Sequence, residues 1–236
     1  MDITDPVFWT ALAKIIGVNI VLSGDNAVVI ALAARSLPPV QQKKAIFWGS
    51  GAAIVLRIVL TLFAVALLAL PWLKLVGSAL LLWIGTKLLI PEDDDPDIDS
   101  SDNLMVAIRT ILIADLVMSL DNVIAVAAAA NDNTVLLILG LAISIPLVVF
   151  GATLLVKVME RWPVIITIGA GLLGFVSGEM AWEDKAIAGF TSQFPHVARW
   201  IVAGAGAAFV VIVGLTLAKR HEASKATDVA ANDSAH

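Results

Sequence analysis

Long apolar runs dominate this sequence and limit the folds open to it. Seven runs of about 20 residues are each long enough to cross the ~30 Å hydrocarbon core of a bilayer as a helix. The chain is 59% hydrophobic and 15% charged, with a mean hydropathy of +0.93, whereas soluble domains carry about 25% charged residues. The runs lack the short alternating segments of an outer-membrane barrel. We therefore predict an all-α, polytopic membrane protein with about seven transmembrane helices at 7–34, 44–69, 71–90, 103–130, 134–157, 162–181 and 198–218.

The predicted spans form one transmembrane domain, residues 1–218, that contains two repeats. Its parts are repeat one at 7–90, an acidic cytoplasmic loop at 91–102, repeat two at 103–181 and the final span at 198–218. After Ala218 the chain becomes polar and rich in small residues, so we expect 219–236 to be a disordered cytoplasmic tail. The first apolar run follows two Asp residues and no basic residue, so we expect no cleavable signal peptide.

A polar pattern occurs twice within the apolar runs. In the segments 19–31 and 115–127, a polar residue is followed four positions later by Ser and six and seven positions later by Asp-Asn. Three spans precede the acidic loop and three follow it, so equivalent spans would cross the membrane in opposite directions. We therefore predict an inverted 3+3 repeat plus one additional helix, the arrangement of many secondary transporters.

Basic residues fall unevenly on the two sides of the predicted spans. One side would hold Arg35, Lys43, Lys44, Lys87, Arg109, Lys157, Arg161, Lys219, Arg220 and Lys225, and the other Lys14, Lys74, Lys185 and Arg199. Loops rich in Lys and Arg stay in the cytoplasm. The asymmetry predicts a multi-pass protein of the cell inner (plasma) membrane, with its N-terminus outside and its C-terminus in the cytoplasm.

Two polar stripes are predicted on the repeated segments, because residues i, i+4 and i+7 share one helical face. The first stripe is Asn19, Ser23 and Asn26, and the second is Asp115, Ser119 and Asn122. Asp25 and Asp121 lie about 100° from these stripes. Both could point into the same cavity if the helix is locally unwound, which Gly24 would ease in the first copy. Carboxylates within a membrane span are costly and indicate a functional site by default.

Clustered carboxylate, amide and hydroxyl oxygens suit divalent cations such as Mn²⁺, Mg²⁺ and Ca²⁺. The chain has no Cys, and its three His residues lie outside the predicted spans, which disfavours zinc and copper. The predicted metal site consists of Asp25 and Asp121 as the main ligands, with Asp115, Asn26 and Asn122 beside them. Supporting residues would be Asn19, Ser23, Ser119, Arg57 and Glu179. Arg57 would serve as counter-ion of the acids when no metal is bound.

A purely structural role is the alternative for these polar residues. Buried Asn and Ser side chains join membrane helices through hydrogen bonds worth about 0.6–2 kcal/mol each. Carboxylates fit that role less well, because an uncompensated cluster of acids takes up protons or holds a cation. The sequence contains no recognisable nucleophile–base pair, phosphate-binding loop or basic stripe. We therefore expect no enzyme, no catalytic residues, no cofactor and no nucleic-acid partner.

Two segments together carry a recognisable signature: Ser23-Gly24-Asp25-Asn26-Ala27-Val28 and Asp115-Leu116-Val117-Met118-Ser119-Leu120-Asp121-Asn122-Val123. This signature resembles that of the TerC family of integral membrane proteins, most closely its YjbE-like branch, and the resemblance covers nearly the whole chain. It implies a place among small cation and amino-acid exporters and, for this family, efflux of Mn²⁺ or related divalent ions. Asn19 stands where the second copy has Asp115, so the two half-sites are not equivalent.

The sequence thus predicts a secondary transporter that exports Mn²⁺, or else Ca²⁺ or Mg²⁺, driven by proton exchange or by membrane potential. The metal ion is the substrate, and the lipid bilayer and coupling protons are the other expected partners. Two alternatives remain open. One is a membrane scaffold or metal-delivery partner for secreted or translocating proteins. The other is an amino-acid exporter, for which Arg57 would be the cationic group that binds the substrate carboxylate.

Overall fold

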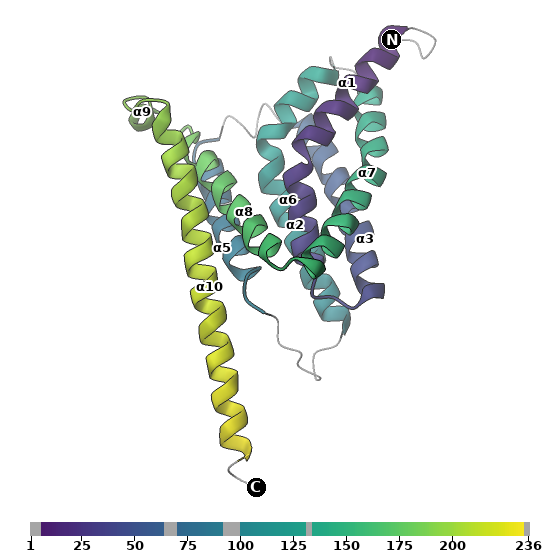
Figure 1. The fold of residues 1–236 in the computed structure, drawn as a ribbon. Helices are drawn as coiled ribbons and strands as arrows, with labels where there is room; N and C mark the ends of the chain where they lie inside the picture. The colour runs from purple at the N-terminus through teal and green to yellow at the C-terminus, as the bar shows by residue number, and fades with distance from the viewer. Residues whose placement is uncertain (1–5, 64–69, 92–99, 131–133, 234–236) are drawn as a thin grey trace.

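The computed structural model describes residues 6–63, 70–91, 100–130 and 134–233. Every regular element in these ranges is helical, which confirms the predicted all-α class (Figure 1). The helices are α1 (Pro6–Leu22), α2 (Gly24–Ala34), α3 (Pro39–Leu62), α5 (Leu73–Lys87), α6 (Ser100–Ala130), α7 (Thr134–Arg161), α8 (Val164–Trp182), α9 (Ala188–Thr191) and α10 (Val197–Asp233). For parts of these helices, including Asp121, 123–130 and 226–233, the side chains are not among the described atoms.

Several of the described helices are long and apolar enough to cross a membrane. Five pass this test alone, namely α3, α6, α7, α8 and α10, and the bent pair α1–α2 makes a sixth if it counts as one span. The predicted crossing at 71–90 differs, because α5 has 15 residues. At about 1.5 Å per residue it is about 22 Å long, less than the ~30 Å hydrocarbon core. The described residues therefore form a multi-pass membrane protein in which five or six helices meet this test, and the predicted count of seven is not confirmed.

The first predicted span, 7–34, is a broken helix. α1 ends at Leu22, α2 begins at Gly24, and the two axes differ by 48°. Gly24 has no positive φ, and a Cβ built on it would meet nothing within 4 Å. The break is therefore present as the sequence suggested, but it does not sterically require glycine at this position.

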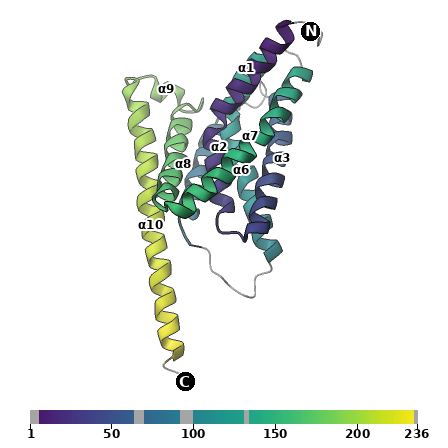
Figure 2. The same cartoon turned by 45° about the vertical axis from the view of Figure 1, so that its right-hand side comes forward.

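The helices pack as two groups, which can be followed in two orientations (Figures 1 and 2). In the larger group α3 packs on α6 and α7, while α1 and α2 pack on the same two helices. In the smaller group α8 packs on both α5 and α10. Contacts of α2 with α8 and of α5 with α6 join the two groups. Both segments that carry the repeated motif therefore lie in the larger group.

Glycines bring α8 and α10 into close contact. The backbones of Gly174 and Gly206 approach so closely that a Cβ on either would overlap the carbonyl group of the other. A Cβ on Gly178 would likewise overlap the Val202 carbonyl. Small residues allow such approach in membrane helices, where tight packing is a main source of association.

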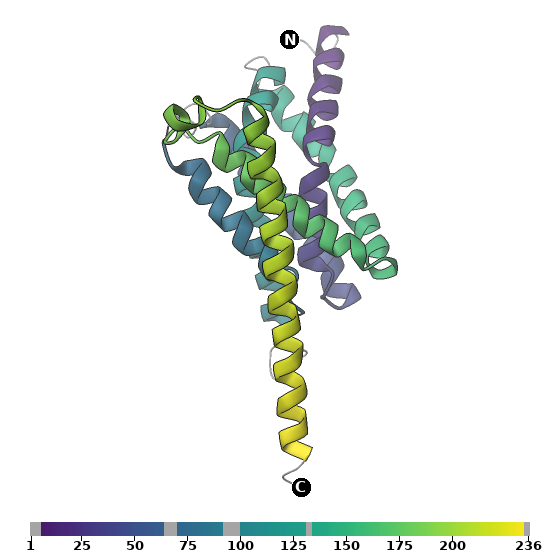
Figure 3. The same ribbon diagram turned by 60° about the vertical axis from the view of Figure 1, so that its left-hand side comes forward.

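The predicted disordered tail differs from the structure. α10 has 37 residues and continues as helix through Asp233, so it projects beyond the other helices (Figure 3). Its last turns contain Ala, Glu and Lys, which have high helix propensity, and they extend a helix that is already nucleated in the membrane. The acidic segment 92–99, the end of the second predicted span at 64–69 and the predicted break at 131–133 lie outside the described residues.

Asp184, which follows α8, ties that helix to the start of α5. It is 1% exposed, and it accepts hydrogen bonds from the backbone N–H groups of Trp72 (3.0 Å), Leu75 (2.9 Å) and Ala186 (2.7 Å). Burial by itself raises the pKa of this carboxyl, but the backbone donors outweigh burial and hold the pKa below its usual value. Asp184 thus caps α5 from a different part of the chain.

Candidate functional site

Arg57 lies at the centre of a buried polar cluster in the larger helix group. Its side chain, on α3, is 3% exposed, and Nη2 lies 2.6 Å from Oδ1 of Asp115 on α6 in an ion pair. Nη1 donates to Oδ1 of Asn19 (2.8 Å) and to Oγ of Ser23 (3.1 Å), and Nε donates to Oγ of Ser119 (2.9 Å). One guanidinium therefore bonds to four oxygen-bearing side chains from two other parts of the bundle.

The oxygen-bearing residues are also linked within each stripe. Ser119 donates to Oδ2 of Asp115 (3.2 Å), and Ser23 donates to Oδ1 of Asn19 (3.4 Å). Both pairs are four residues apart along the chain, as the helical period predicts. The structure therefore brings Asn19 and Ser23 from one motif copy together with Asp115 and Ser119 from the other, on opposite sides of Arg57.

A small cavity of about 10 Å³ adjoins Arg57 and Asp115 and has room for roughly one water molecule. Four atoms that belong to residues lining it are buried and have no hydrogen-bond partner among the described residues: Oδ1 and Nδ2 of Asn26, Nδ2 of Asn19 and Oγ of Ser50. Buried polar atoms without partners are uncommon and call for an explanation such as a bound water or ion. The cluster thus contains buried hydrogen-bond donors and acceptors that could bind a water molecule or an ion.

Ser50 is a member of this cluster that the sequence reasoning missed. It is 1% exposed and lines the same cavity as Arg57. Both residues are on α3, seven positions apart, which places them on one helical face. That spacing from a basic residue inside a span was the signal available in the sequence, but the flanking glycines favoured a packing role.

Asp25 lies in the first turn of α2, directly after the break. Its side chain is half-buried and its Oδ1 accepts a hydrogen bond from the backbone N–H of Asn26 (2.8 Å). The charges of Arg57 and Asp115 are both close enough to act on it. Asp25 is therefore at the edge of the cluster, while Asn26, which is 2% exposed, lies inside it.

Two predicted metal ligands, Asp121 and Asn122, are only partly described by the structure. Asp121 and Asn122 lie in α6 after Asp115, and Asn122 is half-buried, but the Asp121 side chain lies outside the described atoms. Within the described residues no three His, Cys, Asp or Glu side chains gather into a metal-binding group. This finding leaves open the predicted site, since one of its two main ligands is not described.

Glu179 belongs to a different cluster. Its Oε1 accepts hydrogen bonds from Nε (3.0 Å) and Nη2 (2.7 Å) of Arg199 on α10. Arg199 also pairs with Glu183 at 3.1 Å, and Glu183 pairs with Lys74 at 3.1 Å. These ion pairs join α8, α10 and α5, and the structure does not bring Glu179 together with Arg57.

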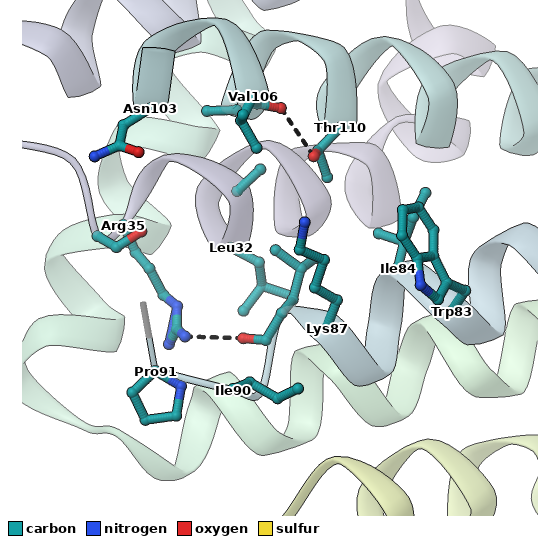
Figure 4. Close-up of a pocket in the computed structure, with 14 residues that line it drawn as sticks. Leu32, Arg35, Trp83, Ile84, Lys87, Ile90, Pro91, Asn103, Val106 and Thr110 are labelled. Carbon is teal, nitrogen blue, oxygen red and sulfur yellow. Dashed lines mark hydrogen bonds between the residues drawn. The ribbon is translucent and has the colours of Figure 1, made fainter. Parts of the chain in front are cut away.

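A larger cavity, about 390 Å³, lies where the ends of α2 and α5 meet the first turns of α6 (Figure 4). Its charged lining residues are Arg35 and Lys87. Arg35 Nη2 donates to the Leu88 carbonyl (2.8 Å), and the Lys87 ammonium lies 5.6 Å from the centre of the Trp83 ring. A lining with two positive charges suits an anionic group and disfavours a metal ion. The cavity therefore differs in its expected ligand from the oxygen-rich cluster around Asp115.

Comparison with known proteins fixes the family. The sequence profile of the integral membrane protein TerC family matches residues 4–222. The chain belongs to the TerC family. The match covers both motif copies and all seven predicted spans, so the recognition of the family from its paired motif is confirmed.

Curated relatives of this TerC protein are membrane proteins from bacteria. It is 45% identical over 186 residues to the uncharacterized membrane protein YjbE of Bacillus subtilis (strain 168), covering 79% of this chain and 85% of YjbE. It is 26% identical over 200 residues to the UPF0053 inner membrane protein YgdQ of Escherichia coli (strain K12), covering 77% of this chain and 84% of YgdQ. No solved structure gives a significant match.

Proposed function

We propose that this TerC protein is a secondary transporter that exports divalent cations, with Mn²⁺ as the main substrate. The observation that carries the proposal is the buried cluster in which four oxygen-bearing side chains already surround one cationic group, Arg57. A site that holds a guanidinium in the membrane interior has the polarity needed for another cation. Asp25 and Asp121, from the two motif copies, would add the negative charge that a divalent ion requires.

The ligand chemistry favours Mn²⁺, Ca²⁺ or Mg²⁺ over zinc and copper. The side chains around Arg57 offer carboxylate, amide and hydroxyl oxygens, and the chain contains no Cys. Such oxygen-rich sites suit hard cations. In this proposal Asp25 and Asp121 are the main ligands, while Asp115, Asn26 and Asn122 complete the site.

The proposal includes an inverted 3+3 repeat with one further helix, an arrangement that would allow transport by alternating access. Two pairs of helix contacts support this proposal: α3 packs on α6 as α7 packs on α1 and α2, and α5 packs on α6 as α8 packs on α2. In transporters built this way the substrate site lies near the midplane, at the interface of the repeats. The short α5 would then be the counterpart of α8, as the seventh transmembrane helix.

The proposed orientation places the N-terminus outside and the C-terminus in the cytoplasm of the inner membrane. The α2–α3 connection, which contains Arg35, lies toward the same end of the molecule as the tip of α10 (Figure 1). Lys and Arg near span ends favour the cytoplasmic side. The relative YgdQ is itself named an inner membrane protein.

The amino-acid exporter is the second candidate function. The cavity of about 390 Å³ lined by Arg35 and Lys87 favours it, because a carboxylate-bearing solute needs such positive groups. Arg57, the residue first considered for that role, is already paired with Asp115. A scaffold or metal-delivery role gains no comparable support, since it needs no buried carboxylate.

A flux measurement in proteoliposomes separates these candidates. Purified protein is reconstituted, and the movement of Mn²⁺, Zn²⁺ and a mixture of amino acids is measured at equal gradients, with protein-free liposomes as the control. We expect Mn²⁺ to move several times faster than Zn²⁺, because the oxygen ligands favour the harder ion. Faster zinc flux would contradict the proposed ligand chemistry, and amino-acid flux without Mn²⁺ flux would favour the second candidate.

A further inference from the structure

Arg57 takes the position that a substrate cation is expected to occupy. Its guanidinium donates to a carboxylate oxygen of Asp115, an amide oxygen of Asn19 and the hydroxyls of Ser23 and Ser119, at 2.6–3.1 Å. These are the kinds of oxygen that a hard divalent ion takes as ligands. The protein therefore supplies, from its own chain, the positive charge that this oxygen cluster requires.

Unused oxygens lie next to this guanidinium. Oδ1 of Asn26 and Oγ of Ser50 are buried, have no hydrogen-bond partner among the described residues, and belong to side chains that line the same cavity as Arg57 and Asp115. Beside the guanidinium the cavity, at about 10 Å³, holds roughly one water molecule, so it has no room for a divalent ion that keeps several of its waters. Withdrawal of Arg57 would free Asp115 and enlarge the space that Asn26 and Ser50 face.

We infer that Arg57 is a tethered competitor of the transported cation. Arg57 and the cation occupy Asp115 in turn, and Ser50 and Asn26 join Asp115 as ligands once the guanidinium has left. This inference rests on the proposed function and adds two points to it. Ser50 becomes a ligand of the cation, and Arg57 becomes the group that displaces the cation from the site. Return of Arg57 to Asp115 displaces the cation and keeps the carboxylate neutralised while the carrier is empty.

The competition has a defined effect on affinity. When Arg57 fills the site most of the time, only the remaining fraction of molecules can bind the cation, and the apparent affinity falls by that fraction. Removal of the tethered charge abolishes this loss. It also leaves the charge of Asp115 buried without a counter-ion, which increases the attraction for any cation that enters.

The test measures Mn²⁺ binding by the purified full-length protein with titration calorimetry. Arg57→Gln keeps hydrogen-bonding capacity but removes the charge, and we expect its Kd for Mn²⁺ to be lower than that of wild type by about tenfold or more. Arg57→Lys keeps the charge but loses the planar set of guanidinium donors. Its Kd for Mn²⁺ should lie between those of wild type and Arg57→Gln. Lys14→Gln is the matched control: Lys14 is an exposed basic residue on α1, and its loss should leave the Kd unchanged.

Two further measurements make the test specific. Ser50→Ala should raise the Kd for Mn²⁺ while the melting temperature of the metal-free protein stays near that of wild type, because Ser50 Oγ has no described partner to lose. In Arg57→Ala, millimolar guanidinium chloride should compete with Mn²⁺, whereas in wild type it should not, because the tethered group already fills that position.

The outcomes are distinguishable. If wild type binds Mn²⁺ but Arg57→Gln binds it no more tightly, the competition is wrong and the proposed function stands. If wild type binds no divalent cation, the proposed function fails and the inference fails with it. If Arg57→Gln does not fold, Arg57→Lys decides: a Kd equal to or above that of wild type overturns the inference.

Discussion

At the scale of single residues, the two stripes could be predicted from the sequence and the arrangement between them could not. Asn19 with Ser23 and Asp115 with Ser119 follow from the helical period alone. Arg57 could be proposed as counter-ion because so few basic residues lie inside the spans. Its bonds to both stripes at once depend on how α3 packs, which no local pattern encodes. Asp25 is less predictable still, since its direction depends on the break before Gly24.

Asp184 provides a prediction at this scale, because one carboxylate holds the start of α5. Asp184→Ala removes three backbone hydrogen bonds and should lower stability at pH 7 by about 1–2 kcal/mol, the upper range for a lost helix cap. Glu183→Ala, which removes only partly exposed ion pairs, should cost less than about 1 kcal/mol. The measurement is the melting temperature of the protein in detergent.

The same carboxylate predicts a dependence on pH. The pKa of Asp184 is lower in the folded protein than the value of about 3.9 expected when unfolded. Its stabilisation is therefore complete above the unfolded pKa and is lost as pH falls through the folded pKa. The difference in melting temperature between wild type and Asp184→Ala should be constant from pH 7 to about pH 5 and shrink below about pH 4. A difference that persists unchanged at pH 3 would contradict this account of the cap.

At the scale of helices, the sequence predicted where the membrane helices occur better than it predicted how long they are. The apolar runs indicated each membrane helix, yet α5 is short and α10 long. α5 begins only after Trp72, whose φ is 71° and whose N–H bonds to Asp184, a residue more than 100 positions away. α10 extends because good helix formers follow the membrane segment. Tertiary contacts in one case and helix propagation in the other override the hydropathy pattern.

The contact between α8 and α10 gives a prediction for these elements. Gly206→Leu places a side chain against the Gly174 carbonyl and should destabilise the protein by about 1–3 kcal/mol, the usual cost of overpacking. Gly204→Leu, on the same helix, meets nothing within 4 Å of its Cβ and should be neutral or slightly stabilising, since leucine has the higher helix propensity. Equal melting temperatures for the two variants would show that this contact does not hold the helices together.

At the scale of the whole molecule, the start of α1 and the end of α10 lie at opposite ends (Figure 1). The proposed seven crossings would likewise leave the two termini on opposite sides of the membrane. Composition and the paired motif were sufficient to predict a multi-pass TerC protein, because both depend on residue type rather than on packing. The proposed repeat symmetry and orientation concern the bundle as a unit and need tests on the intact protein.

Reporter fusions test the proposed orientation. A cytoplasmic reporter fused after Lys225, beyond the basic cluster at Lys219 and Arg220, should be active, because Lys and Arg near span ends remain in the cytoplasm. An export-dependent reporter at the same position should be inactive. A fusion in the loop at Lys185 should show the reverse pair of activities. Activity of the exported reporter at Lys225 would reverse the orientation and the direction of transport assigned to the site.

The most direct test of the central claim is Mn²⁺ flux through the double variant Asp25→Asn, Asp121→Asn in proteoliposomes. The change keeps side-chain size but removes the two charges proposed to bind the divalent ion. Glu222→Gln, an exposed charge change on α10, is the control and should transport like wild type. We predict that the double variant folds, loses Mn²⁺ flux and no longer gains thermal stability from added Mn²⁺, because only the charged site binds the ion. Mn²⁺ flux at the wild-type rate in the double variant would contradict the claim that these two carboxylates form the transport site.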